Sequence, residues 1–145
     1  LQKVAEKRQN NESIKKIIKN IALFLLSASL IGTIIIYFFS VPIFDIAFGN
    51  KWKTAAQISQ VLIFYFCLDF ITTPLSVVFI ALEKIKINSI WKITHFLLIC
   101  SLYFYSDVEL FDFITAFMLI NVISYTIYGI LIFMAVKNYE ISLLV

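Results

Sequence analysis

One carboxylate lies in the middle of a long apolar stretch of this sequence. Asp69 is followed, at the spacing of one helix face, by three hydroxyl side chains: Thr72, Thr73 and Ser76. A charge costs free energy in apolar surroundings, so the acid is a candidate site for a cation or a proton, or for an ion pair with a basic side chain. The alternative is a satisfied polar contact between helices. Pro74 cannot donate a backbone hydrogen bond and predicts a kink one turn beyond Asp69.

Two further polar faces occupy the later apolar stretches. Asn88, Lys92 and His95 form the first, and the ammonium of Lys92 either returns to a polar boundary or faces an aqueous cavity. The second combines one amide with three hydroxyl groups at helical spacing: Asn121, Ser124, Tyr125 and Tyr128. Such a face points into a helix bundle or a cavity, away from an apolar solvent. Ordinary polar contacts between helices are the simpler explanation for both.

Four apolar stretches must position these groups, and they cover about 21–46, 58–82, 87–105 and 111–136. About 20 apolar residues in a helix cross a hydrocarbon core of roughly 30 Å. Hydrophobic residues make up 61% of the 145 residues and the mean hydropathy is +0.94, which excludes an ordinary soluble domain. The sequence therefore predicts an all-α integral membrane protein with four transmembrane helices, and the short loops between them predict that successive helices are antiparallel neighbours. A polar segment of 20 residues precedes the first stretch, unlike a cleaved signal peptide.

The basic residues indicate how the chain is oriented. Ten of the twelve Lys and Arg residues lie before the first span, around the loop at 83–86, or after the last span, and only Lys51 and Lys53 lie on the other side. The positive-inside rule places both ends in the cytoplasm. Residues 1–20 then form an amphipathic cytoplasmic lead-in and residues 137–145 a cytoplasmic tail. The basic excess is a topology signal, so no nucleic-acid partner is expected.

A few residues suggest helix packing and helix ends. Ala28 and Gly32 are four residues apart, a spacing that lets another helix approach closely. Gly49 is suited to ending a helix, and Trp52 and Trp91 to anchoring the chain at the membrane interfaces. 

Metal or cofactor chemistry is not expected from this sequence. Cys67 and Cys100 lie in different spans, and the chain has a single histidine. Two cysteines and one histidine do not make a zinc site, and the two thiols are expected to be buried and unpaired.

Several short motifs resemble one family. Residues 42–45 read PIFD, residues 48–56 read FGNKWKTAA, residues 73–76 read TPLS, and residues 81–86 read ALEKIK. This pattern resembles the C-terminal half of bacterial polysaccharide flippases, which export O-antigen and capsule units and belong to the multidrug/oligosaccharidyl-lipid/polysaccharide superfamily. The resemblance is carried mainly by residues 1–82. This chain has Glu83 where the family usually has glycine.

The resemblance implies the C-terminal part of a larger helical transporter bundle in the bacterial inner membrane. Such a protein is not an enzyme and needs no cofactor. It moves undecaprenyl-diphosphate-linked oligosaccharide repeat units across the membrane for O-antigen (lipopolysaccharide), capsule or exopolysaccharide synthesis. The expected partners are the lipid-linked oligosaccharide, membrane lipids, a polysaccharide polymerase and chain-length proteins.

The family reading suggests a role for each polar face. Lys92 and His95 would meet diphosphate or glycan, Asp69 would bind a coupling cation or proton, and the hydroxyls of the last span would bind sugar. Two alternatives stay open at this point. One is an exporter of the same superfamily with another cargo, a lipid-linked peptidoglycan precursor or a drug. The other is a membrane-embedded glycan transferase or polymerase, which the short loops and the single arginine, Arg8, disfavour.

Overall fold

A computed structural model describes residues 2–10, 12–105 and 107–143, and within these residues the chain is helical with no strand. A short helix, α1 (Gln2–Gln9), precedes the long helix α2 (Lys15–Phe48). After a single 3₁₀ turn (Asn50–Trp52) come α3 (Lys53–Leu75), the short α4 (Val77–Ala81), α5 (Ile85–Ser101) and, after a second 3₁₀ turn (Leu102–Tyr105), α6 (Leu110–Ser142). The predicted all-α fold is confirmed.

Four helical segments are long and apolar enough to cross a membrane: Lys15–Phe48, Asn50–Ala81, Ile85–Tyr105 and Leu110–Ser142. The first and last extend past the apolar stretches seen in the sequence. Helix α2 begins within the polar lead-in, and α6 continues through most of the predicted tail. Both extensions lie at the same end of the molecule, where they contact each other.

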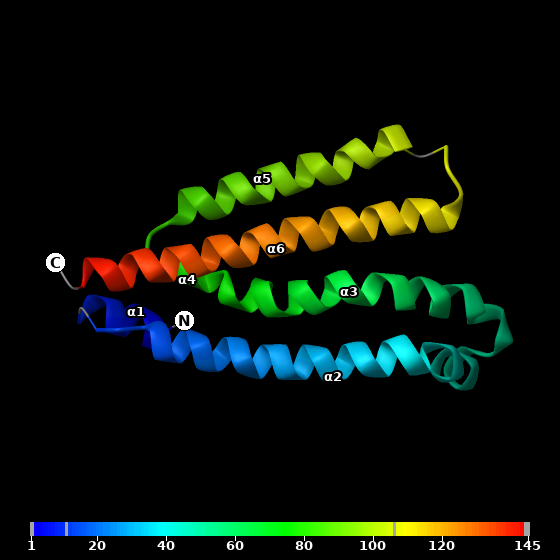
Figure 1. Ribbon diagram of the computed structural model, residues 1–145, viewed down its shortest axis with the longest axis horizontal. Coiled ribbons are helices and arrows are strands. Elements are labelled where there is room, and N and C mark those ends of the chain that lie inside the picture. Colours follow the sequence, from blue (N-terminus) through cyan, green and yellow to red (C-terminus); the bar gives the residue numbers. More distant parts are fainter. Residues whose placement is uncertain (1, 11, 106, 144–145) are drawn as a thin grey trace.

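The long helices lie side by side in the order α2, α3, α6, α5 (Figure 1). The short loops suggested that each helix would pack against its predecessor. That expectation is wrong for α3 and α5, because α6 lies between them. The short helix α4 leads away from α3, and its Phe79 ring stacks on Tyr128 of α6 at 5.7 Å between ring centroids. This contact holds the end of the second span against the last helix.

Pro74 and Gly49 interrupt or end helices as the sequence predicts, whereas Gly32 does not make the helix contact expected of it. Pro74 has no N–H, and the helix is interrupted at Ser76 before α4 resumes the direction of the chain. Gly49 ends α2 with φ at +84°, a conformation that glycine adopts without strain. Gly32 is different, because a Cβ added there would meet no heavy atom within 4 Å. The close helix approach expected at Gly32 is therefore not made by the described residues.

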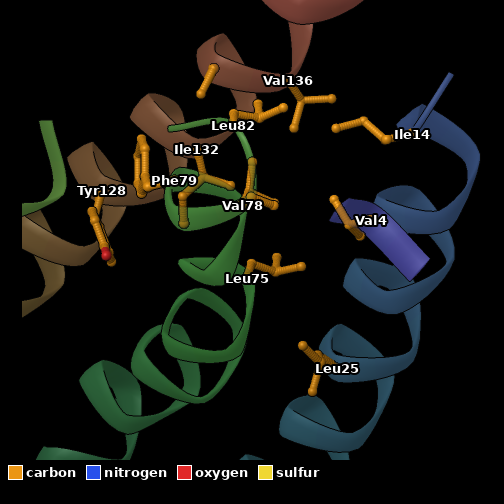
Figure 2. Close-up of a cluster of buried hydrophobic side chains, with 12 residues drawn as sticks. Val4, Ile14, Leu25, Leu75, Val78, Phe79, Leu82, Tyr128, Ile132 and Val136 are labelled. Carbon is orange, nitrogen blue, oxygen red and sulfur yellow. The ribbon is translucent and has the colours of Figure 1, made fainter. Parts of the chain in front are cut away.

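Most of the buried apolar side chains form one cluster, which Figure 2 shows. Phe79 and Ile14 are fully buried there, and Val78 and Tyr128 are nearly so. These residues come from α4, from the start of α2 and from α6, and Val4 of α1 belongs to the same cluster. Along the rest of the row many large apolar side chains are exposed, as expected for helices whose solvent is lipid.

Candidate functional site

Two hydrogen bonds between pairs of side chains join α5 to α6. The hydroxyl of Tyr128 donates to Oδ1 of Asn88 at 2.6 Å, and both side chains are buried. Nearly two turns further along α5, Nε2 of His95 lies 3.1 Å from Oδ1 of Asn121. The amide of Asn121 also donates to the carbonyl oxygen of Phe117 at 2.7 Å. The polar faces predicted on these two helices therefore meet each other, with the histidine and both amides engaged.

Trp91 lies at the centre of this contact between α5 and α6, which we call the α5–α6 seam. Its indole ring stacks on Tyr128 with 3.7 Å between ring centroids and on His95 with 5.0 Å. Tyr125 contacts it edge-on at 5.5 Å, and the indole N–H donates to the carbonyl oxygen of Ser124 at 3.3 Å. Ser124 thus contributes its backbone to the seam. The sequence suggested that Trp91 was an interfacial anchor, although its helical spacing from Asn88 and His95 was a signal of the observed role.

Asp69 lies on α3. Its Oδ1 accepts a hydrogen bond from the hydroxyl of Thr73 on the same helix at 2.5 Å. Tyr65 lies one helical turn before it, and the Tyr65 ring stacks on that of Tyr125 of α6 with 6.3 Å between ring centroids. Among the described residues no Lys or Arg nitrogen lies within 4 Å of this carboxylate. Asp69 is therefore a half-buried acid inside a membrane-spanning helix that has hydroxyl neighbours and no ion pair in the described chain.

The other hydroxyls of the predicted Asp69 face bond to their own helix. Thr72 donates to the carbonyl oxygen of Leu68 at 2.8 Å, and Ser76 donates to that of Thr73 at 2.7 Å. Neither hydrogen bond involves the acid. Tyr65, which the sequence analysis missed, lies four residues before Asp69, and helical spacing was the signal that would have found it.

Lys92 is separated from the groups with which it was grouped. Its side chain is exposed, whereas Asn88 is buried and His95 is half-buried against α6. Within residues 2–10, 12–105 and 107–143 Lys92 forms no ion pair. The polar face predicted for α5 is thus divided: Asn88 and His95 face α6, whereas the ammonium of Lys92 is exposed.

The loop between α2 and α3 carries Gly49 and Trp52. Trp52 is half-exposed, and its ring lies 5.5 Å from that of Phe48, an arrangement suited to an interfacial aromatic anchor. The two cysteines are unpaired, but they are not buried as expected: Cys67 is half-buried and Cys100 is exposed. The described part of the chain contains no group of three His, Cys, Asp or Glu side chains arranged to hold a metal ion.

Ionic contacts tie the lead-in to the helix ends. Oε1 of Glu140 accepts hydrogen bonds from the hydroxyl of Ser13 at 3.0 Å, from the N–H of Ile14 at 2.8 Å and from the N–H of Lys15 at 2.9 Å. A carboxylate from α6 thereby satisfies backbone donors at the start of α2. This contact links the start of α2 to the part of α6 that extends beyond 136.

Arg8 makes the second contact, with the turn between α4 and α5. Its Nη1 lies 2.7 Å from Oε1 of Glu83 and donates to the carbonyl oxygen of Ala81 at 3.1 Å. The hydrogen bond and charge of Arg8 hold the pKa of Glu83 below its usual value. Glu83 has a φ of +56°, a left-handed conformation in which glycine is favoured. 

Comparison of the chain with protein-family models, with curated proteins and with solved structures found no match.

Proposed function

We propose that this chain is the membrane-embedded part of a transporter that moves a polar, lipid-linked solute across the bilayer, with Asp69 as its functional acid. The observation that carries the proposal is the half-buried Asp69 carboxylate, which lies inside a spanning helix and has no ion pair among the described residues. An ionised side chain at that depth costs free energy, so a residue of this kind is by default a candidate for a functional role. Its hydroxyl neighbour Thr73 brings no positive charge, so a proton or a cation would neutralise the acid.

The proposed cargo is an undecaprenyl-diphosphate-linked oligosaccharide, carried from the inner to the outer leaflet of the bacterial inner membrane for O-antigen, capsule or exopolysaccharide synthesis. The motifs at 42–45, 48–56 and 73–76 support this choice through their resemblance to polysaccharide flippases. The basic residues support an orientation with both ends of the chain in the cytoplasm. In this reading a polysaccharide polymerase and chain-length proteins are partners, and no bond of the cargo is broken.

The contacts divide the polar residues into two groups with different roles. Tyr128, Asn88, His95 and Asn121 bond to one another, so we assign them to holding α5 against α6 in a fixed register. Asp69 and Lys92 have charges that the described residues do not neutralise by ion pairing. We assign coupling to Asp69 and contact with the diphosphate to Lys92.

Complementation of a deletion strain tests the acid in cells. Asp69→Asn keeps the shape of the side chain and its bond to Thr73 but removes the charge. Asp112→Asn is the matched control, because Asp112 is exposed in the first turn of α6. We expect the Asp69 variant to reach the membrane normally, to lose surface polysaccharide and to accumulate lipid-linked repeat units, while the control restores export. Full export by Asp69→Asn at normal membrane levels would remove the acid from the mechanism.

A further inference from the structure

An apolar groove runs between α2 and α6 over the surface of α3. It encloses about 370 Å³ and is lined by Ala22, Leu26, Leu75, Ile132 and Phe133, among others. At its deep end lie Thr72 and Gly129, and at its mouth Lys15 and Lys19. A wider hollow of about 580 Å³ adjoins the mouth and shares lining residues with the groove. The two hollows share Lys15, Phe133 and Val136, and both lie at the end of the row where α2 begins and α6 ends (Figure 1).

The mouth of the groove is positively charged. Lys15 and Lys19 come from successive turns of α2, and Lys137 comes from α6. None of these ammonium groups forms an ion pair in the described part of the chain. Glu140 is the acid among the described lining residues, and its Oε1 is already occupied by three donors at the start of α2. Three lysines against one acid leave the described lining of the two hollows with a net positive charge.

The depth of the groove matches one leaflet of a bilayer. From Lys15 to Leu26 the helix rises about 16 Å, close to half of a hydrocarbon core of roughly 30 Å. The lysines therefore lie at headgroup level when the lining apolar side chains lie at acyl-chain level. An occupant of this site needs an apolar chain about one leaflet long and an anionic head.

We propose that this groove binds an anionic phospholipid of the adjoining leaflet, with an acyl chain between α2 and α6 and its phosphate among Lys15, Lys19 and Lys137. The bound chain covers the gap that α2 and α6 leave over α3. The headgroup links the start of α2 to the end of α6, next to the hydrogen bonds of Glu140. This site does not depend on the identity of the transported solute.

Photolabelling of the intact protein in vesicles tests the proposal. The vesicles consist of phosphatidylcholine with a minor share of phosphatidylglycerol that carries a photoactivatable acyl chain, and labelled residues are identified by mass spectrometry. We expect labels to concentrate on Leu26, Ile132 and Phe133. The double substitution Lys19→Gln/Lys137→Gln should reduce this labelling about fivefold for each lysine removed. Lys16→Gln/Lys86→Gln is the matched control, because it removes two exposed charges near the same end that do not line the groove.

A second variant separates the groove from the charges. Ala22→Phe fills the groove without changing its charge and should lower labelling of Ile132 and Phe133 while the helical content stays that of the wild type. Three results would overturn the proposal. They are equal labelling by photoactivatable phosphatidylcholine, protection of the groove by another protein segment, and labelling by a polyprenyl diphosphate probe but not by phosphatidylglycerol.

Discussion

Tyr128 of α6 and Asn88 of α5 form a direct, buried hydrogen bond of 2.6 Å. The stacked rings of Tyr128 and Trp91 cover it, so the bond and the aromatic packing support the same helix contact. Polar contacts of this kind join helices in a membrane, where apolar burial alone does little to favour association. The α5–α6 seam is therefore a structural unit, and Asp69, the acid that we propose to act in transport, lies on α3.

Tyr128→Phe tests this role for the seam. The substitution keeps the stacked ring but leaves the Asn88 amide oxygen without its donor, so we expect a loss of about 1 kcal/mol of folding free energy. Unfolding of the purified protein in detergent measures the loss. In a double-mutant cycle, Asn88→Leu/Tyr128→Phe should cost less than the two single substitutions added together. Strict additivity would show that the two side chains do not interact.

Glu140→Ala tests the cap that α6 provides for α2. The variant leaves the hydroxyl of Ser13 and the N–H groups of Ile14 and Lys15 without their shared acceptor. Loss of such a cap costs about 1 kcal/mol, and amide hydrogen exchange should become faster in the first turn of α2. Glu140→Gln retains an acceptor oxygen and should show a smaller effect. Unchanged exchange in the alanine variant would contradict the assigned cap.

The contact between Arg8 and Glu83 predicts a pH effect at α1. Arg8 lowers the pKa of the Glu83 carboxyl from its ordinary value of 4.5, so the pair stabilises the folded state when the carboxyl is ionised. That stabilisation is present above pH 4.5 and is lost as pH falls through the lowered pKa of the folded state. The protection factors of the α1 amides, which correct for the pH dependence of intrinsic exchange, should therefore fall in acid. Glu83→Gln should lower these protection factors already at neutral pH, and identical pH profiles of protection for both proteins would exclude the pair as the cause.

Glu83 also allows the backbone to be tested separately. Both Glu83→Gly and Glu83→Ala remove the ion pair, but only glycine adopts a φ of +56° without strain. The glycine variant should be more stable than the alanine variant by about 1 kcal/mol in the same unfolding assay. Equal stabilities would mean that the left-handed turn is not maintained in the variants.

The sequence predicted the helices better than their arrangement. Apolar length and turn residues such as Gly49 and Pro74 located the four spans, because these signals are local. The position of α6 between α3 and α5 could not be read from loop length, since hydropathy does not encode lateral order. Glu140 and the start of α2 are more than 120 residues apart, so no local pattern revealed their contact.

The candidate site was predicted in part for the same reason. Helical spacing brought His95 and Asn121 into polar faces, and the two faces do meet. The spacing did not distinguish the edge of α5 that packs on α6 from the edge at which Lys92 is exposed. Trp91 was assigned to the membrane interface because residue type was weighed more than its place on the helix. Asp69 was identified by its charge alone, which is a signal that requires no knowledge of packing.

A flipping assay in reconstituted vesicles tests the central claim most directly. The intact protein is incorporated with a fluorescent undecaprenyl-diphosphate-linked oligosaccharide, and the fraction accessible to an impermeant reagent outside the vesicles is followed with time. The wild type and Asp112→Asn should equalise the two leaflets, and Asp69→Asn should do so at least about tenfold more slowly, which corresponds to a barrier raised by about 1.4 kcal/mol. Flipping by Asp69→Asn at the wild-type rate, or no flipping by the wild type, would contradict the account.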